Sequence, residues 1–199
     1  MKKILLSAIL AFAFGCKTQN STTVKTESKN EISRLSKTSD GDLLGQGNVK
    51  DLFGEPFRAG FSAGYDSYKP DVETVSKLRD LTNGISVKIF MGTWCEDSQN
   101  QVPKCYKILH DAGFDKNDVT LIFVDRSKTT PEKLEAGLNI TNVPTFIFNK
   151  TTQLAGKEGP RGETIAKELN RIVESPRETL EKDMLKILSN QPYKHTYAD

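Results

Sequence analysis

The stretch that decides the fold is VKIFMGTWCEDS, residues 87–98, which runs on to Pro103. It begins as an apolar, β-leaning run that ends in Gly92-Thr93, and a segment with helical spacing follows. The apolar stripe of that segment consists of Val102, Cys105, Tyr106 and Leu109. Cys95 stands where the predicted strand meets the helix, beside free backbone N–H groups and the positive end of the helix dipole, and both stabilise a thiolate. The sequence therefore predicts a nucleophilic thiol at the first turn of a helix.

Two motifs resemble the thioredoxin family. Trp94-Cys95-x-x-Ser98, with Pro103 five residues further on, is similar to the thioredoxin active-site helix, and Val143-Pro144-Thr145 resembles the cis-proline turn of that family. The resemblance covers Asp51 to Val173. It implies a thioredoxin-like α/β fold, with a mixed central sheet flanked by helices, to which this chain adds a C-terminal helical extension.

The resemblance implies roles for six residues. The catalytic residues are Cys95 as nucleophile and Ser98, whose hydroxyl either donates to the thiolate or is a neutral replacement. The substrate-binding residues are Trp94, Val143, Pro144 and Thr145. Trp94 either shields one side of the thiol or is an ordinary core aromatic. The backbone of Val143 is expected to pair with an extended client segment.

The chain departs from the family pattern at two positions. Ser98 replaces the second active-site cysteine, and Ile89 occupies a strand position that is often a buried acid. With Ser98 in that place, a mixed disulfide at Cys95 is not resolved within the site. A cysteine of the client, a small thiol or a separate reductase must therefore release it.

The N-terminus has the features of an export signal. Met1-Lys2-Lys3 is followed by the short apolar run Ile4–Phe14, which is too short to span a bilayer. Ala13-Phe14-Gly15-Cys16 resembles a bacterial lipobox, so we expect residues 1–15 to be removed and Cys16 to be lipidated; ordinary cleavage after Ala13 is the alternative. Either pathway places the protein outside the cytoplasm. With lipidation we expect it to be anchored in the bacterial cell envelope, on the periplasmic side.

Composition predicts one globular domain with extensions. Residues 16–47 are polar and are interpreted as a lipidated N-terminus and flexible tether, residues 48–174 as the thioredoxin-like domain, and residues 175–199 as a helical extension. The formal net charge is +2, and it falls to about zero once Lys2 and Lys3 are removed. This balance gives no reason to expect a nucleic-acid partner.

Hydrophobic periodicity predicts the elements of the domain. In chain order they are a helix from Pro70 to Leu81, a strand at Ile85–Met91, a helix from Cys95 to Asp111, a strand at Val119–Val124, a short helix after Thr130-Pro131, a strand at Thr145–Phe148 with a hairpin partner at Gln153–Gly156, a helix through Ile165, Leu169, Ile172 and Val173, and a last helix that starts at Ser175.

Other chemistry has little support in the sequence. Cys95 and Cys105 are ten residues apart on one predicted helix, about 15 Å, which is too far for a disulfide. Cys105 is therefore expected to be a buried core thiol. His110 and His195 have no companion ligands at metal spacing, and no cofactor motif is present.

These observations leave two functional hypotheses. The first is monothiol thiol–disulfide exchange or isomerisation through Cys95 on client proteins that contain cysteines or disulfides. The second is a non-catalytic binding or adaptor module that uses the thioredoxin-fold surface. The acidic pair Glu96-Asp97 and the apolar Ile89 favour the second hypothesis.

Overall fold

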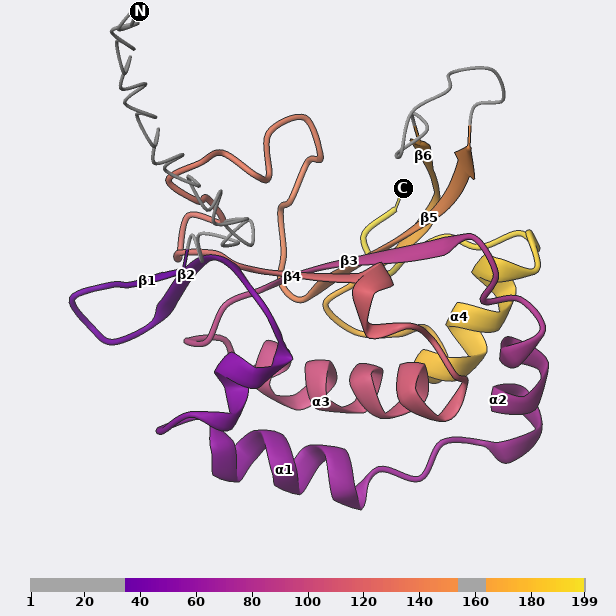
Figure 1. Ribbon diagram of the computed structural model, residues 1–199, viewed down its shortest axis with the longest axis horizontal. Helices are drawn as coiled ribbons and strands as arrows, with labels where there is room; N and C mark the ends of the chain where they lie inside the picture. The colour runs from indigo at the N-terminus through magenta and orange to yellow at the C-terminus, as the bar shows by residue number, and fades with distance from the viewer. Residues whose placement is uncertain (1–34, 154–163, 199) are drawn as a thin grey trace, which may run out of the picture. The chain divides into compact units, whose positions relative to one another are not determined.

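The computed structural model describes residues 35–153 and 164–198 and shows a mixed α/β fold, a six-stranded mixed sheet flanked by helices (Figure 1). The strand order across the sheet is β1-β2-β4-β3-β5-β6. The strands are β1 Ser36–Lys37, β2 Leu43–Gly47, β3 Ile85–Met91, β4 Val119–Phe123, β5 Thr145–Gln153 and β6 Thr164–Val173. β3 and β4 are parallel, and every other neighbouring pair is antiparallel. The expected α/β class with a mixed sheet is confirmed.

The helices pack on one face of this sheet (Figure 1). They are α1 Arg58–Ser67, α2 Val72–Arg79, α3 Glu96–Asp111 and α4 Leu180–Leu188, with short 3-10 helices at Val49–Phe53 and Lys116–Asp118. Alternate residues of β3 point toward them, because successive side chains of a strand lie on opposite faces. The β3 residues that share a core with all four helices are Ile85, Val87, Ile89 and Met91.

A smaller apolar cluster covers the face of the sheet that is opposite to the four helices. Its buried members are Phe90, Ile122, Val124, Val143 and Ile147, and partly buried Trp94, Cys95, Leu134, Leu138 and Ile140 pack against them. The segment that joins β4 to β5 supplies this cover without forming a helix. The predicted helix after Thr130-Pro131 is therefore wrong. Lys133 has φ +54° and Gly137 has φ +76°, and these left-handed backbones interrupt a right-handed helix.

The central predictions hold. The strand Ile85–Met91 is confirmed at both ends, and the helix that follows it runs over Glu96–Asp111 with Cys95 as its N-cap. α2 begins after Asp71, whose side chain accepts a hydrogen bond from the Thr74 amide at 2.8 Å.

The C-terminal half of the sheet differs from the sequence prediction. The sequence predicts a turn at Asn149–Thr152 and a hairpin partner at Gln153–Gly156, but β5 continues through this stretch to Gln153. The strand that pairs with β5 is β6, which replaces the predicted helix through Ile165. A register shift at Phe148/Asn149 leaves Leu169 as the extra residue of a β-bulge. The bulge brings Leu169 and Ile172, three positions apart, into the same core, which imitates helical spacing.

The folded sheet begins before residue 48. β1 and β2 lie within the stretch interpreted as a tether, and β2 pairs with β4 through Gly45, Gln46 and Gly47. Cys16 and the predicted signal sequence lie outside the described residues. At the other end, the last helix begins at Leu180 and not at Ser175, because Thr179 is its N-cap and accepts from the Lys182 amide. No helix among residues 35–153 and 164–198 is both long enough and apolar enough to cross a membrane.

Candidate functional site

Cys95 lies at the N-terminus of α3, half-buried, with an extended backbone at φ −97° and ψ 121°. Its amide donates to the carbonyl of Gly92 at 3.1 Å, and its carbonyl accepts the first helical bond from the Gln99 amide at 3.0 Å. The thiol donates a hydrogen bond to the carbonyl oxygen of Val143, with Sγ 3.2 Å from that oxygen. The structure therefore places the thiol at the predicted strand-to-helix junction, against the turn that precedes β5.

Hydrogen bonds on the opposite side fix the loop that presents this thiol. The hydroxyl of Thr93 accepts from the Leu43 amide at 3.1 Å and donates to the Asp42 carboxylate at 2.9 Å. The side-chain amide of Gln99 donates to the Thr93 carbonyl at 2.6 Å. The loop between β3 and α3 is thus held by β2 and by the first turn of α3. Asp42 was not identified from the sequence, because 51 positions separate it from Thr93 and no local pattern connects the two.

Trp94 packs on the small apolar cluster, as does the neighbouring Cys95. Its indole Nε1 donates to the carbonyl of Val124 at 2.9 Å, and the guanidinium of Arg126 lies over the ring at 5.2 Å from its centroid. Gly92 permits this position, because a Cβ there would lie 2.4 Å from Cε2 of the indole. The single tryptophan is therefore fixed between β4 and the loop that carries Cys95.

The turn opposite Cys95 contains a cis peptide bond between Val143 and Pro144, as the resemblance implies. All three residues of the predicted substrate-binding turn have buried side chains. The Thr145 hydroxyl donates to the Asn142 carbonyl at 2.6 Å, and the backbone amide of Glu174 donates to the Pro144 carbonyl at 2.7 Å. Among the described residues, the amide of Val143 has no hydrogen-bond partner. Contact with a client at this turn would therefore fall to the backbone of Val143 and not to these side chains.

Ser98 is fully buried, and its hydroxyl oxygen accepts from the Gly92 amide at 3.3 Å. The structure has no hydrogen bond between Ser98 and Cys95. Ser98 therefore supports the loop between β3 and α3 from the buried side. Its hydroxyl contacts the backbone on the β3 side of that loop.

The described residues contain one further thiol. Cys105 is 0% exposed in the core under α3, and burial raises the pKa of its thiol far above its ordinary value. The prediction of a buried core thiol is confirmed, and Cys105 is out of reach of a mixed disulfide at Cys95. Ile89, at the position that is often acidic, is also fully buried among apolar side chains.

The charged groups around the site come from the first turn of α3 and from the segment after β4. Glu96 and Asp97 lie in the first turn, where acidic side chains favour the helix. Asp125 accepts from both the amide and the hydroxyl of Thr129, so it closes a turn. Arg126, over Trp94, brings a positive charge to this side of the site. In residues 35–153 and 164–198, no three His, Cys, Asp or Glu side chains are grouped so that they could hold a metal ion.

Comparisons with protein-family models, with curated proteins and with solved structures found no match to this chain.

Proposed function

We propose that this chain is a thioredoxin-like protein of the bacterial cell envelope that performs monothiol thiol–disulfide exchange or isomerisation through Cys95. The observation that carries the proposal is the position of Cys95, a half-exposed thiol at the N-terminus of a 16-residue helix and 3.2 Å from the Val143 carbonyl. Free N–H groups and the helix dipole at that end stabilise the thiolate, which is the form that attacks a disulfide.

The thioredoxin-like identity rests on the way the two motifs meet. The segments around Cys95 and Pro144 are far apart in the sequence, yet the structure brings the thiol against the cis-proline turn. β3, α3 and β4 supply the strand, helix and parallel strand that hold the thiol at one end of the sheet.

Of the two cysteines in the described part of the chain, only Cys95 is within reach of a client, and Cys16 is proposed to carry lipid. The Cys95 thiolate attacks one sulfur of a client disulfide, an S–S bond forms at Cys95, and the other client sulfur leaves as a thiolate. No net oxidation or reduction occurs in this step. A second thiolate must then attack the mixed disulfide and return Cys95 to its thiolate form. Since Cys105 is buried, this thiolate belongs to the client, to a small thiol or to a separate reductase.

Client recognition would use the backbone beside the thiol. An extended segment that contains the disulfide would accept from the Val143 amide, in the manner of an added strand, and lie beside Trp94. No cofactor is required. We further propose that lipidation of Cys16 holds the protein at the membrane, on the periplasmic side.

The test is refolding of a scrambled disulfide protein in a glutathione buffer. The chain should accelerate refolding, Cys95→Ser should not, and the matched control Cys105→Ala should retain the rate. If Cys95→Ser is as active as the unchanged chain, the proposed chemistry is wrong. If neither protein accelerates refolding and Cys95 reacts no faster with iodoacetamide than Cys105, the thioredoxin-fold surface acts as a binding or adaptor module.

A further inference from the structure

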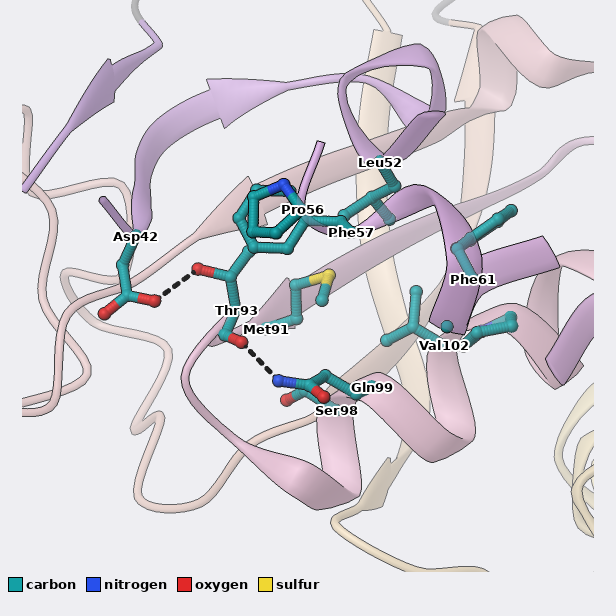
Figure 2. A pocket seen from close by; sticks show the side chains of 12 residues that line it. Asp42, Leu52, Pro56, Phe57, Phe61, Met91, Thr93, Ser98, Gln99 and Val102 are labelled. Atoms are coloured by element: carbon teal, nitrogen blue, oxygen red, sulfur yellow. Dashed lines mark hydrogen bonds between the residues drawn. The ribbon is translucent and has the colours of Figure 1, made fainter. Parts of the chain in front are cut away.

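A cavity of about 430 Å³ lies beside the loop between β3 and α3 (Figure 2). It is bounded by the start of β2, by the segment from Leu52 to Phe61 and by the first turns of α3. Its volume falls in the range of about 300–1,000 Å³ that is usual for small-molecule sites. Cys95 is not among the residues that line it.

The residues that line this cavity form an apolar part and a polar part, and the polar part includes the half-buried Asp42 and the exposed Gln99. The apolar wall consists of Leu52, Pro56, Phe57, Phe61, Met91, Val102 and Pro103. The polar end consists of Asp42, Thr93, Ser98 and Gln99. Figure 2 shows Asp42 and Gln99 on either side of Thr93, each joined to it by a hydrogen bond. A ligand with an apolar body and one polar head would match this arrangement.

The charged group at the polar end is Asp42, and the unused donors there, the Ser98 hydroxyl and the second N–H of the Gln99 side chain, are neutral. Thr93 is occupied on its hydroxyl by Leu43 and Asp42 and on its carbonyl by Gln99. The Asp42 carboxylate uses Oδ1 for Thr93, and Oδ2 has no partner among the described residues. The side-chain oxygen of Gln99 is likewise without a partner there. Asp42 also forms no ion pair with any described lysine, arginine or histidine, so a carboxylate without its own cation borders an apolar cavity.

We infer that this cavity is a binding site for a small organic cation, an amine with an apolar or aromatic body. The ammonium would donate to Asp42 Oδ2, and the charged acceptor makes such a bond stronger than a neutral one. The body would lie against Phe57 and Phe61, whose ring faces also attract cations. The inference is independent of the chemistry proposed for Cys95.

The probes are 2-phenylethylamine, 2-phenylethanol and 3-phenylpropionate, which share an aromatic body and differ in the charge of the head. Each is titrated into the ¹⁵N-labelled chain while amide shifts of residues that line the cavity, such as Gly60, Thr93 and Gln99, are followed. We expect saturable binding of the amine, binding of the alcohol at least about tenfold weaker, and no binding of the carboxylate. Binding of the carboxylate as tight as that of the amine, or saturable binding of none of the three, overturns the inference.

Two variants locate the binding. Gly60→Leu fills the cavity from α1, where a Cβ meets nothing within 4 Å, and should abolish binding of the amine. Ala59→Leu, at an exposed neighbouring position that does not line the cavity, should leave it unchanged. Asp42→Asn should remove the preference for the amine over the alcohol. Full amine binding by Gly60→Leu would show that the probe binds elsewhere and would overturn the assignment, whether or not Asp42→Asn folds.

Discussion

Gly92→Ala should displace Trp94 from its place on the small apolar cluster. An added Cβ would lie 2.4, 2.6 and 2.8 Å from Cε2, Nε1 and Cζ2 of the indole. The nearest of these distances is about 1 Å shorter than ordinary contact between carbon atoms. All three atoms belong to the rigid indole ring, so the whole Trp94 side chain has to move. This movement weakens the 2.9 Å hydrogen bond from Nε1 to the Val124 carbonyl.

The expected cost is the sum of two terms. Overpacking of a well-packed site costs about 1–3 kcal/mol, and a weakened hydrogen bond adds about 1 kcal/mol. We therefore expect Gly92→Ala to lower the free energy of unfolding by about 2–4 kcal/mol, which corresponds to a urea midpoint lower by roughly 1–2 M.

Urea unfolding followed by intrinsic fluorescence measures both effects, because Trp94 is the only tryptophan of the chain. The native emission of Gly92→Ala should shift to the red as the ring moves toward solvent. Gly60→Ala is the matched control, since a Cβ there meets nothing within 4 Å and the helix should gain about 0.5–1 kcal/mol. An unchanged midpoint together with an unchanged native spectrum in Gly92→Ala would refute the reasoning.

Three further predictions concern buried polar groups and thiols. Iodoacetamide should modify Cys95 in the native chain and reach Cys105 only after unfolding, as peptide mass spectrometry would show; equal native rates would contradict the burial. The pKa of Tyr68 is raised mainly by burial and secondly by its hydrogen bond to Glu181. Above about pH 10 the phenol ionises in the unfolded chain before it does in the folded chain, so the free energy of unfolding should fall as the pH rises. Tyr68→Phe should reduce that dependence in urea titrations without abolishing it, because burial also raises the pKa values of Tyr106 and Tyr193; an unchanged dependence would contradict the burial of Tyr68. In Asp183→Asn, a side-chain NH2 group replaces a buried carboxylate oxygen and faces a backbone N–H. Chemical denaturation should show a free energy of unfolding lower by about 1–3 kcal/mol, and an unchanged free energy would refute this.

The part of the fold that the sequence predicts well has strong local signals. Ile85–Met91 is apolar, rich in β-branched residues and ended by Gly92, and α3 has an amphipathic stripe over four turns. The meeting of Cys95 with the turn at Pro144 was anticipated only through the family resemblance, because nothing in the spacing of the two segments predicts their contact.

The misread parts have weak or misleading local signals. β6 looks helical because the bulge at Leu169 changes the period of its apolar residues. β2 lies in a polar stretch, and its place in the sheet depends on pairing with Phe123 and Ile122, nearly eighty positions away. Asn149–Thr152 has turn composition, yet Thr151 is held in β5 by its amide and hydroxyl, which donate to the carbonyl of Gly84 at 2.7 and 2.9 Å. Tertiary pairing overrides local preference in each case.

The same reason explains the uneven prediction of the site. The thiol and its helix follow from residues that are adjacent in the sequence. The groups that position the loop, Asp42 and Gln99, act through single long-range or backbone hydrogen bonds that leave no sequence pattern. For Ser98 the motif left two roles open, donation to the thiolate or a neutral replacement, and its hydroxyl in the structure lies against Gly92.

The central claim is that Cys95 is a working monothiol. The most direct measurement is the mass attached to Cys95 in the chain purified from an oxidising cell envelope, with alkylation of free thiols at lysis. We predict mixed disulfides with small thiols or client proteins on Cys95 that disappear on reduction and are absent from Cys95→Ser. A Cys95 recovered wholly as the free, alkylated thiol, with no adduct in the envelope, would contradict the account.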